Sequence, residues 1–218
     1  MVSKKRPQIA WLVARARDVL RLLPPRGGGA PPLIIDACGG RGGLGLALAA
    51  ALPFARVAVL DACAPAVAAG ARAAEAAGLS NVAFLHAALP LPDGAAGLRA
   101  AAGGGAALLL GLHACGGLSD EVLALARDLG AAFCVAPCCF TKHGGCGAGP
   151  WGADVARALE RLAESEHGGL RRPAMAAINS TRLHAHEGWA APRLLAFPEE
   201  LSAKNQVLWG VPRAWGCS

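Results

Sequence analysis

The chain has 218 residues, of which 54% are hydrophobic, and its 21 Lys and Arg outnumber its 15 Asp and Glu to give a net charge of +6. This length suits one large α/β unit and is short for two. No apolar run reaches the roughly 18 residues of a membrane-spanning helix, so we expect no membrane partner. The eight cysteines, in a chain without a secretory signal, indicate free thiols and a cytoplasmic location.

The N-terminal segment carries the whole charge excess. Residues 1–26 hold seven basic residues and one acid, whereas the remainder is balanced. An Arg-rich start also resembles an organelle transit peptide, but a discarded presequence needs no buried face. A solvated helix face explains such charges, and a basic surface also suits an acidic partner such as RNA. We predict a helix because apolar residues recur at helical spacing, at Ile9, Leu12, Val13, Ala16, Leu20 and Leu23.

Strand-like and helix-like segments alternate after a Gly/Pro-rich connector. We expect strands at 33–37, 56–61, 81–87, 106–114 and 131–139, and helices at 44–52, 65–77, 118–129 and about 153–166. Ser119 and Asp120 are candidate caps of the helix over 118–129, and 88–105 and 141–152 are expected loops. Two further strands, at 174–180 and 205–211, have no helix between them. The pattern predicts a mostly parallel sheet with an antiparallel pair at one edge.

The segment from Asp36 to Gly45, DACGGRGGLG, joins the first expected strand to the next helix. Its glycines fit the G-x-G-x-x-G pattern of loops that bring a nucleotide to a helix N-terminus, although close packing alone also requires glycine. Asp61 ends the second expected strand, where a carboxylate binds the hydroxyls of a ribose. These features fit NAD and S-adenosylmethionine equally.

Asp36 distinguishes these two ligands by charge. Like charges about 4 Å apart at an effective dielectric constant of 20 cost about 4 kcal/mol, so a carboxylate at this loop disfavours a pyrophosphate. S-adenosylmethionine brings an ammonium and a sulfonium, which the same carboxylate stabilises. The sequence therefore favours S-adenosyl-L-methionine as the cofactor.

Five segments carry a family resemblance: IIDACGGRGGLGLALA, VAVLDA, GLSNVAFLHAAL, LGLHACGGLSD and FCVAPCCF. They resemble class I S-adenosylmethionine-dependent methyltransferases. More narrowly, they are similar to the branch that includes the methyltransferase domain of glutathione S-transferase C-terminal-domain-containing protein and related methyltransferase-like proteins. The likeness covers residues 3–140 and 204–210.

The resemblance implies an α/β, Rossmann-like fold with a mostly parallel seven-stranded sheet, flanking helices and an antiparallel edge strand near the C-terminus. It also implies a single methyltransferase domain over residues 1–218. Within it, 1–25 form the basic helix, 33–140 the cofactor-binding core, and 141–218 the substrate-side loops and last strands. RNA modification is the expected activity, with RNA as the favoured acceptor and a small-molecule or protein acceptor as the open alternative; no DNA partner is expected, and protein partners are unknown.

The resemblance further assigns roles to single residues. From its place at the end of the fourth expected strand and from imidazole chemistry, not from the resemblance, His113 is the candidate catalytic residue, as a general base or an orienting group; the equal alternative is that it holds the cofactor or the strand end. Ala88 stands where many relatives have an acid that binds the adenine, so backbone groups are expected to replace it. The expected cofactor contacts are Asp36, Gly40 and Gly42 for the methionyl part, with Cys38 in place of a glycine, Asp61 and Ala62 for the ribose, and His86 and Ala87 for the adenine.

The second half of the chain supplies the candidate substrate contacts Cys138, Phe140 and Arg182. Cys138, Cys139, His143 and Cys146 form C-C-x3-H-x2-C, which differs from the paired C-x2–4-C spacing of zinc sites. Adjacent cysteines are expected to chelate poorly because their side chains diverge, so we assign no metal ligands and expect small, buried thiols. A non-catalytic methyltransferase-like scaffold and a Cys/His metal-binding module remain the alternatives to an enzyme.

Overall fold

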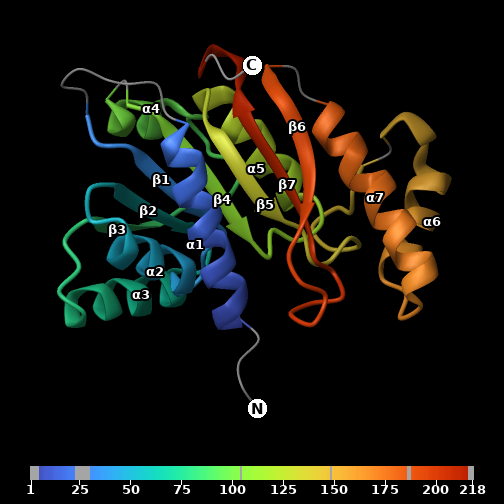
Figure 1. The fold of residues 1–218 in the computed structure, drawn as a ribbon, viewed down its shortest axis with the longest axis horizontal. Helices are drawn as coiled ribbons and strands as arrows, with labels where there is room; N and C mark the ends of the chain where they lie inside the picture. The colour runs from blue at the N-terminus through green and yellow to red at the C-terminus, as the bar shows by residue number, and fades with distance from the viewer. Residues whose placement is uncertain (1–4, 23–29, 104, 148, 186–187, 216–218) are drawn as a thin grey trace.

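Seven strands form one sheet in the order β3-β2-β1-β4-β5-β7-β6 (Figure 1). The computed structural model describes residues 5–22, 30–103, 105–147, 149–185 and 188–215. The strands are β1 (Leu33–Ala37), β2 (Arg56–Asp61), β3 (Val82–His86), β4 (Ala107–Leu112), β5 (Ala132–Ala136), β6 (Trp189–Ala196) and β7 (Gln206–Pro212). The helices are α1 (Lys5–Arg21), α2 (Gly43–Ala51), α3 (Ala64–Ala76), α4 (Ala96–Ala102), α5 (Leu118–Leu129), α6 (Ala153–Ala163) and α7 (Gly168–His184).

The first five strands are parallel, and β7 runs antiparallel to both β5 and β6. β1 and β5 are buried along their whole length, as expected of apolar strands with helices on both faces of the sheet. The chain builds outward from β1 to β3 and then returns to place β4 on the other side of β1. Strand order therefore reverses between β1 and β4, which is where open α/β sheets bind ligands. The expected α/β fold, with a mostly parallel seven-stranded sheet, is confirmed.

Each face of the sheet has its own hydrophobic core. Leu12 and Ala16 of α1 pack with Leu48 of α2 against one face, and Leu98 of α4 and Val122 of α5 pack against the other. Helices α6 and α7 form a separate pair beside β6 (Figure 1), with a small core around Phe140 and Met175. Burial of these apolar faces holds the ends of β1, β2, β4 and β5 in fixed positions.

The C-terminal part differs from the sequence prediction. Residues 174–180 belong to α7, and the strand that pairs with β7 is β6 instead. Met175, Asn179 and Leu183 are buried at spacings of four, which is the repeat of a helix face and not of a strand. The prediction was wrong because the short apolar run AMAAI fits a strand as well as a buried helix segment, and only the longer repeat distinguishes them.

Two smaller predictions also differ. Residues 88–105, expected as a loop, contain α4. Helix α5 begins after Gly117, and neither Ser119 nor Asp120 caps it. The Ser119 hydroxyl instead donates to the Ala114 carbonyl at 2.6 Å, and Asp120 pairs with an arginine of α7.

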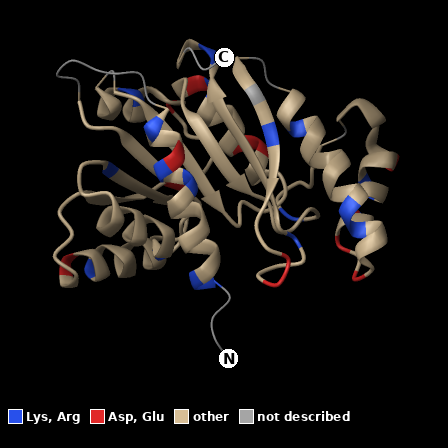
Figure 2. Ribbon diagram, in the orientation of Figure 1, with Lys and Arg blue, Asp and Glu red and all other residues tan. Residues whose placement is uncertain are grey.

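The predicted N-terminal helix is confirmed as α1, and its stripe at Leu12, Val13 and Ala16 is buried. Leu23 lies outside the described residues. Lys and Arg lie at the N-terminal end of this helix and in its C-terminal half, with none between residues 7 and 14 (Figure 2). Arg15 and Arg21 both pair with Asp18, whereas Lys5 and Arg6 are exposed at the N-terminal end. Among the described helices, none has the length and apolar character needed to cross a bilayer.

Candidate active site

The loop between β1 and α2 is tight because its glycines leave no room for side chains. Gly42 has a φ of 72°, and a Cβ there would lie 2.5 Å from the Phe84 ring. A Cβ on Gly45 would lie 2.3 Å from the Val59 side chain. A side chain at either position would push α2 away from the sheet. The glycine pattern therefore seats the N-terminus of α2 directly over the ends of β1 and β2.

Asp36 lies at the centre of this junction, in β1, and is only 1% exposed. Its Oδ2 accepts a hydrogen bond from the Gly45 N–H at 2.8 Å, which joins β1 to the first turn of α2. Burial raises the pKa of Asp36 to about 7; the Asp61 carboxylate adds to this rise, and the Gly45 hydrogen bond opposes it. An arriving positive charge would favour the ionised carboxylate, and a negative charge would disfavour it.

Asp61 is held at the end of β2 by two backbone donors. Its Oδ2 accepts from the Gly40 N–H at 2.7 Å, and its Oδ1 accepts from the Cys63 N–H at 2.8 Å. These bonds fix both oxygens, and each oxygen retains lone-pair capacity for a further donor. The carboxylate therefore presents two acceptors to whatever lies beyond the strand end.

Two cavities meet at Cys38. The Asp61 cavity, of about 490 Å³, is lined by Cys38, Leu60, Asp61, Ala62, Cys63, Ala87, Ala88, Leu89, Leu118 and His143. The Asp36 cavity, of about 340 Å³, is lined by Lys5, Ile9, Asp36, Cys38, Gly39, Gly40, Arg41, Gly43, Leu44, Leu112 and His113. Each volume is within the range of small-molecule sites, about 300 to 1,000 Å³. Together they place one carboxylate on each side of the Cys38 side chain.

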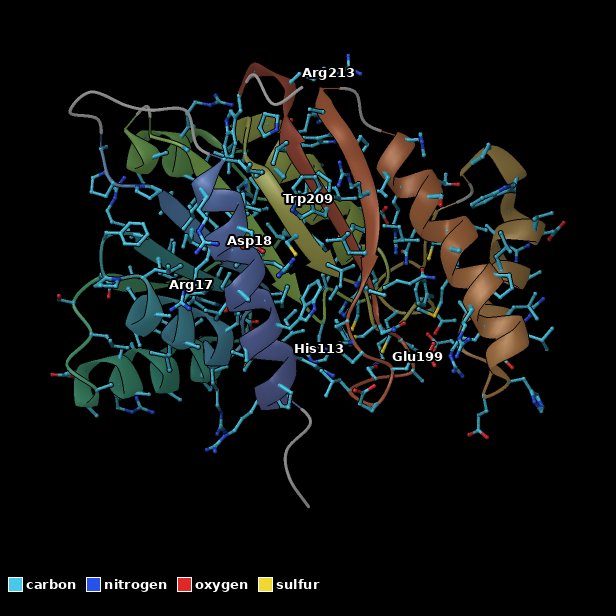
Figure 3. The ribbon with its side chains drawn as sticks, viewed as in Figure 1. Arg17, Asp18, His113, Glu199, Trp209 and Arg213 are labelled. Carbon is cyan, nitrogen blue, oxygen red and sulfur yellow. The ribbon has the colours of Figure 1, made fainter. Side chains whose placement is uncertain are left out.

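His113 follows β4 directly and lines the Asp36 cavity. Figure 3 shows it beside the N-terminal part of α1. Its Nε2 is buried and has no hydrogen-bond partner among the described residues. Burial lowers the pKa of His113, and the nearby Lys5 ammonium lowers it further, so the ring is neutral at pH 7. A neutral imidazole with an unpaired nitrogen can accept a proton or orient a donor.

The other expected cofactor residues divide into two groups. Ala62 and Ala87 line the Asp61 cavity, and Gly40 lines the Asp36 cavity. Gly42 and His86 line neither cavity: Gly42 allows the turn, and the His86 Nε2 contacts the Ala62 carbonyl at 3.1 Å. His86 therefore supports the segment that follows Asp61 from outside the cavity.

Two of the three expected substrate contacts, Phe140 and Arg182, lie away from both cavities, and the third, Cys138, lies in a group of cysteines described below. Phe140 is 0% exposed and packs in the core of α6 and α7. Arg182 is 3% exposed and lines neither cavity. Its guanidinium makes two bonds of 2.9 Å to Asp120 and one of 2.7 Å to the Gly116 carbonyl. Arg182 thus joins α7 to α5 and to the loop after β4, which is a structural task.

Several cavity residues were not predicted. Lys5 and Ile9 reach the Asp36 cavity from α1, and Leu118 and His143 reach the Asp61 cavity. Lys5 and Ile9 line the cavity because of the side of the sheet on which α1 packs. No local sequence signal indicates that side.

Three cysteines meet beyond the ends of β4 and β5. The Cys115 and Cys138 sulfurs are 2.7 Å apart, and those of Cys138 and Cys139 are 3.7 Å apart. Hydrogen bonding from Cys138 lowers the pKa of the Cys115 thiol to about 6, and the same contact raises that of Cys138. The side chains of the adjacent pair converge, contrary to the expected divergence. Cys146 lies elsewhere, with its sulfur 3.4 Å from the Phe140 carbonyl.

A model of the family described as a methyltransferase domain matches residues 4–143. The chain belongs to the methyltransferase-domain family. The match covers α1, the glycine loop, both carboxylates and the three cysteines, so it includes every element of the site described above. No curated protein has a sequence that matches this methyltransferase domain.

Solved structures are similar to this methyltransferase domain at low sequence identity. The SAH-bound Podospora anserina methyltransferase PaMTH1 has a TM-score of 0.56 at 16% identity, over 94% of this chain and 77% of that chain. EvdMO1 has a TM-score of 0.50 at 21% identity, over 94% of this chain and 41% of that one. The apo S-adenosylmethionine-dependent methyltransferase SibL has a TM-score of 0.49 at 18% identity, over 83% of this chain and 50% of that one. The methyltransferase domain therefore spans half or less of EvdMO1 and SibL.

The contacts of Arg182 predict a loss of stability when this residue is replaced. In Arg182→Met, the Asp120 carboxylate and the buried Gly116 carbonyl lose their partner, so we expect the free energy of unfolding to fall by about 2 to 3 kcal/mol. The control is Arg172→Met on the same helix, which removes only an exposed pair with Glu199 and should cost less than about 1 kcal/mol. Urea denaturation of both variants measures the difference, and equal losses would contradict the structural role.

Proposed function

We propose that this protein transfers the methyl group of S-adenosylmethionine to an acceptor, and that the acceptor is RNA. The observation that supports the cofactor is the pair of cavities that meet at Cys38, with Asp36 in one and Asp61 in the other. A ligand with a nucleoside at one end and a cationic amino acid at the other matches both carboxylates. Membership of the methyltransferase-domain family agrees with this ligand.

The residues present fit the two ends of such a cofactor. Asp61 offers two fixed carboxylate oxygens to the two hydroxyls of a ribose, and Ala62, Ala87 and Leu89 provide apolar wall for a base. In the other cavity, Asp36 offers negative charge to an ammonium. Gly40 lines the same cavity with backbone atoms only. A Cβ added there would lie 4.0 Å from its nearest neighbour, the Asp61 Oδ2, so the space beside this backbone is open.

A dinucleotide fits the Asp36 cavity less well. A pyrophosphate there would favour the protonated form of Asp36 and would gain no compensating charge from this carboxylate. Lys5 and Arg41 also line the cavity, and both come from its outer elements, the start of α1 and the loop. The buried ionisable group of this cavity is Asp36, and an approaching positive charge favours its ionised form.

When bound, S-adenosylmethionine would supply a methyl group bonded to a sulfonium; the acceptor would form a bond to the methyl carbon as its bond to sulfur breaks, and S-adenosylhomocysteine would leave. His113 adds a neutral imidazole with an unpaired Nε2 at the Asp36 cavity. This nitrogen can take the proton of an acceptor hydroxyl or amine, or hold the acceptor by a hydrogen bond. Leu112, Leu44 and Ile9 border the same cavity with apolar side chains, and the low dielectric there strengthens the attraction between an ionised Asp36 and a cationic ligand. Alignment by these groups accounts for much of the expected rate.

The basic end of α1 supports RNA as the acceptor. Lys5 lines the Asp36 cavity together with His113, and the next residue, Arg6, is exposed, so two cations lie at this end of α1, which we take as the entrance to the cavity. Arg15 and Arg21 are engaged with Asp18 and contribute less. The narrower likeness to methyltransferase-like proteins also favours RNA. Cations at the entrance would bind the phosphates that flank a target nucleotide.

Calorimetry with S-adenosylhomocysteine tests the cofactor assignment. We expect the wild type to bind S-adenosylhomocysteine and not NAD, and Asp61→Asn to weaken binding by about 10- to 100-fold because one charged acceptor for the ribose is lost. The control is Asp93→Asn, an exposed carboxylate outside both cavities, which should leave binding unchanged. Absence of binding to the wild type would overturn the proposed function. Unchanged binding by Asp61→Asn would overturn the ribose assignment.

Transfer of labelled methyl groups tests the acceptor. With labelled S-adenosylmethionine, we expect incorporation into the RNA fraction of a cell extract, and a severalfold loss at moderate salt in Lys5→Ala. The control is Arg72→Ala, which removes an exposed cation of α3 away from the entrance. Label that appears only in protein or in small molecules would refute RNA as the acceptor and leave the cofactor assignment in place.

A further inference from the structure

We propose that Cys115, Cys138 and Cys139 form a zinc site with three thiolate ligands and an open fourth position. Their three sulfur atoms all lie within 4.8 Å of one another, and all three side chains are half-buried. This inference rests on the three cysteines alone and does not depend on the proposed cofactor or acceptor.

The topology of the sheet brings these sulfurs together. Cys115 follows β4, the adjacent pair follows β5, and these strands are parallel neighbours. Their carboxyl ends therefore lie side by side at the edge that also carries Asp36 and Asp61. The chain arrives from two separate loops, so the ligands surround a point and do not lie along one segment.

The two loops are locked to each other by the backbone. The Gly116 N–H donates to the Cys139 carbonyl at 2.5 Å, and the Gly117 N–H donates to the Lys142 carbonyl at 3.3 Å. A Cβ on Gly116 would lie 1.6 Å from the Lys142 carbonyl oxygen, so only glycine permits this approach. Arg182 holds the Gly116 carbonyl from the other side. Ligands fixed in this way need little rearrangement to bind a metal ion.

The geometry suits a thiophilic ion in tetrahedral coordination. Zn–S distances of about 2.3 Å place two tetrahedral sulfurs about 3.8 Å apart. Cys138 and Cys139 already match this spacing at 3.7 Å, and Cys115 and Cys138, at 2.7 Å, need to separate by about 1 Å. Three soft sulfur ligands with no carboxylate favour zinc over magnesium or calcium.

The fourth position distinguishes this site from a closed structural one. Among the residues that the structure describes, no imidazole or carboxylate joins the three sulfurs in a candidate metal group. Cys146, which the spacing C-C-x3-H-x2-C would add, instead contacts the Phe140 carbonyl, and His143 lines the Asp61 cavity. Zinc with three protein ligands keeps a water or an external ligand in the fourth position.

The test is metal binding by the full chain, reduced and freed of metal with a chelator. We expect one zinc ion per chain in competition with a chromophoric chelator, and one cobalt ion with strong thiolate-to-cobalt absorption and the bands of tetrahedral coordination. Bound zinc should also protect three thiols from a disulfide reagent. Because these measurements use the wild type, they do not depend on the folding of a variant.

Substitutions then identify the ligands. Cys115→Ser, Cys138→Ser and Cys139→Ser should each weaken zinc binding by more than about 100-fold. Cys146→Ser and Cys63→Ser, which alter nearby and exposed thiols outside the group, should keep one ion per chain at unchanged affinity. Failure of the wild type to compete for zinc would overturn the proposal, as would loss of the ion in Cys146→Ser or its retention in Cys115→Ser. A Cys115–Cys138 disulfide that persists under reducing conditions would also overturn it.

Discussion

The site depends on one buried carboxylate in the middle of the sheet. Asp36 accepts the Gly45 N–H and so ties β1 to the helix that begins over its end. Gly42 and Gly45 pack closely at the same junction. The Asp61 carboxylate accepts the Gly40 N–H there. Burial raises the pKa of Asp36 to about 7, so the ligand-free protein holds a carboxylate that gains from an approaching cation. The same residue therefore orders the loop and determines which ligand charge the loop accepts.

The reversal of strand order places the remaining groups around that carboxylate. Asp61 ends β2 and lines one cavity, His113 directly follows β4 and lines the other, and the two cavities meet at Cys38. β5 adds the adjacent cysteines beside Cys115. The C-terminal helix α7 supports this edge of the sheet through Arg182. The Arg182 guanidinium donates to the Gly116 carbonyl and to Asp120, and thereby fixes the loop that carries Cys115. Two neighbouring groups of side chains thus lie at this edge of the sheet. One consists of the Asp36 and Asp61 carboxylates with the His113 imidazole, and the other of the three cysteine sulfurs.

Much of this arrangement could be predicted from the sequence because it is encoded locally. The glycine spacing, Asp36 and Asp61 lie within single strand-to-helix units, and the structure places all of them at the cavities or their supporting loop. The failures concern residues whose role depends on distant partners. Arg182 was expected at the substrate, but its charge is taken up by Asp120 of α5. Phe140 was expected there too, and it lies under α6 and α7. The grouping of Cys115 with Cys138 follows from the pairing of β4 with β5, whereas the contribution of Lys5 requires knowing where α1 packs.

The most direct test of the role of Asp36 is the pH dependence of ligand affinity. S-adenosylhomocysteine carries an ammonium, and 5′-methylthioadenosine shares its thionucleoside but has no amino acid. As the pH falls below about 7, Asp36 becomes protonated, so calorimetry should show the affinity for S-adenosylhomocysteine falling by up to about tenfold per pH unit. The affinity for 5′-methylthioadenosine should change little, and Asp36→Asn should remove the difference between the two ligands. Equal pH profiles for both ligands, or a profile that Asp36→Asn leaves intact, would contradict the account.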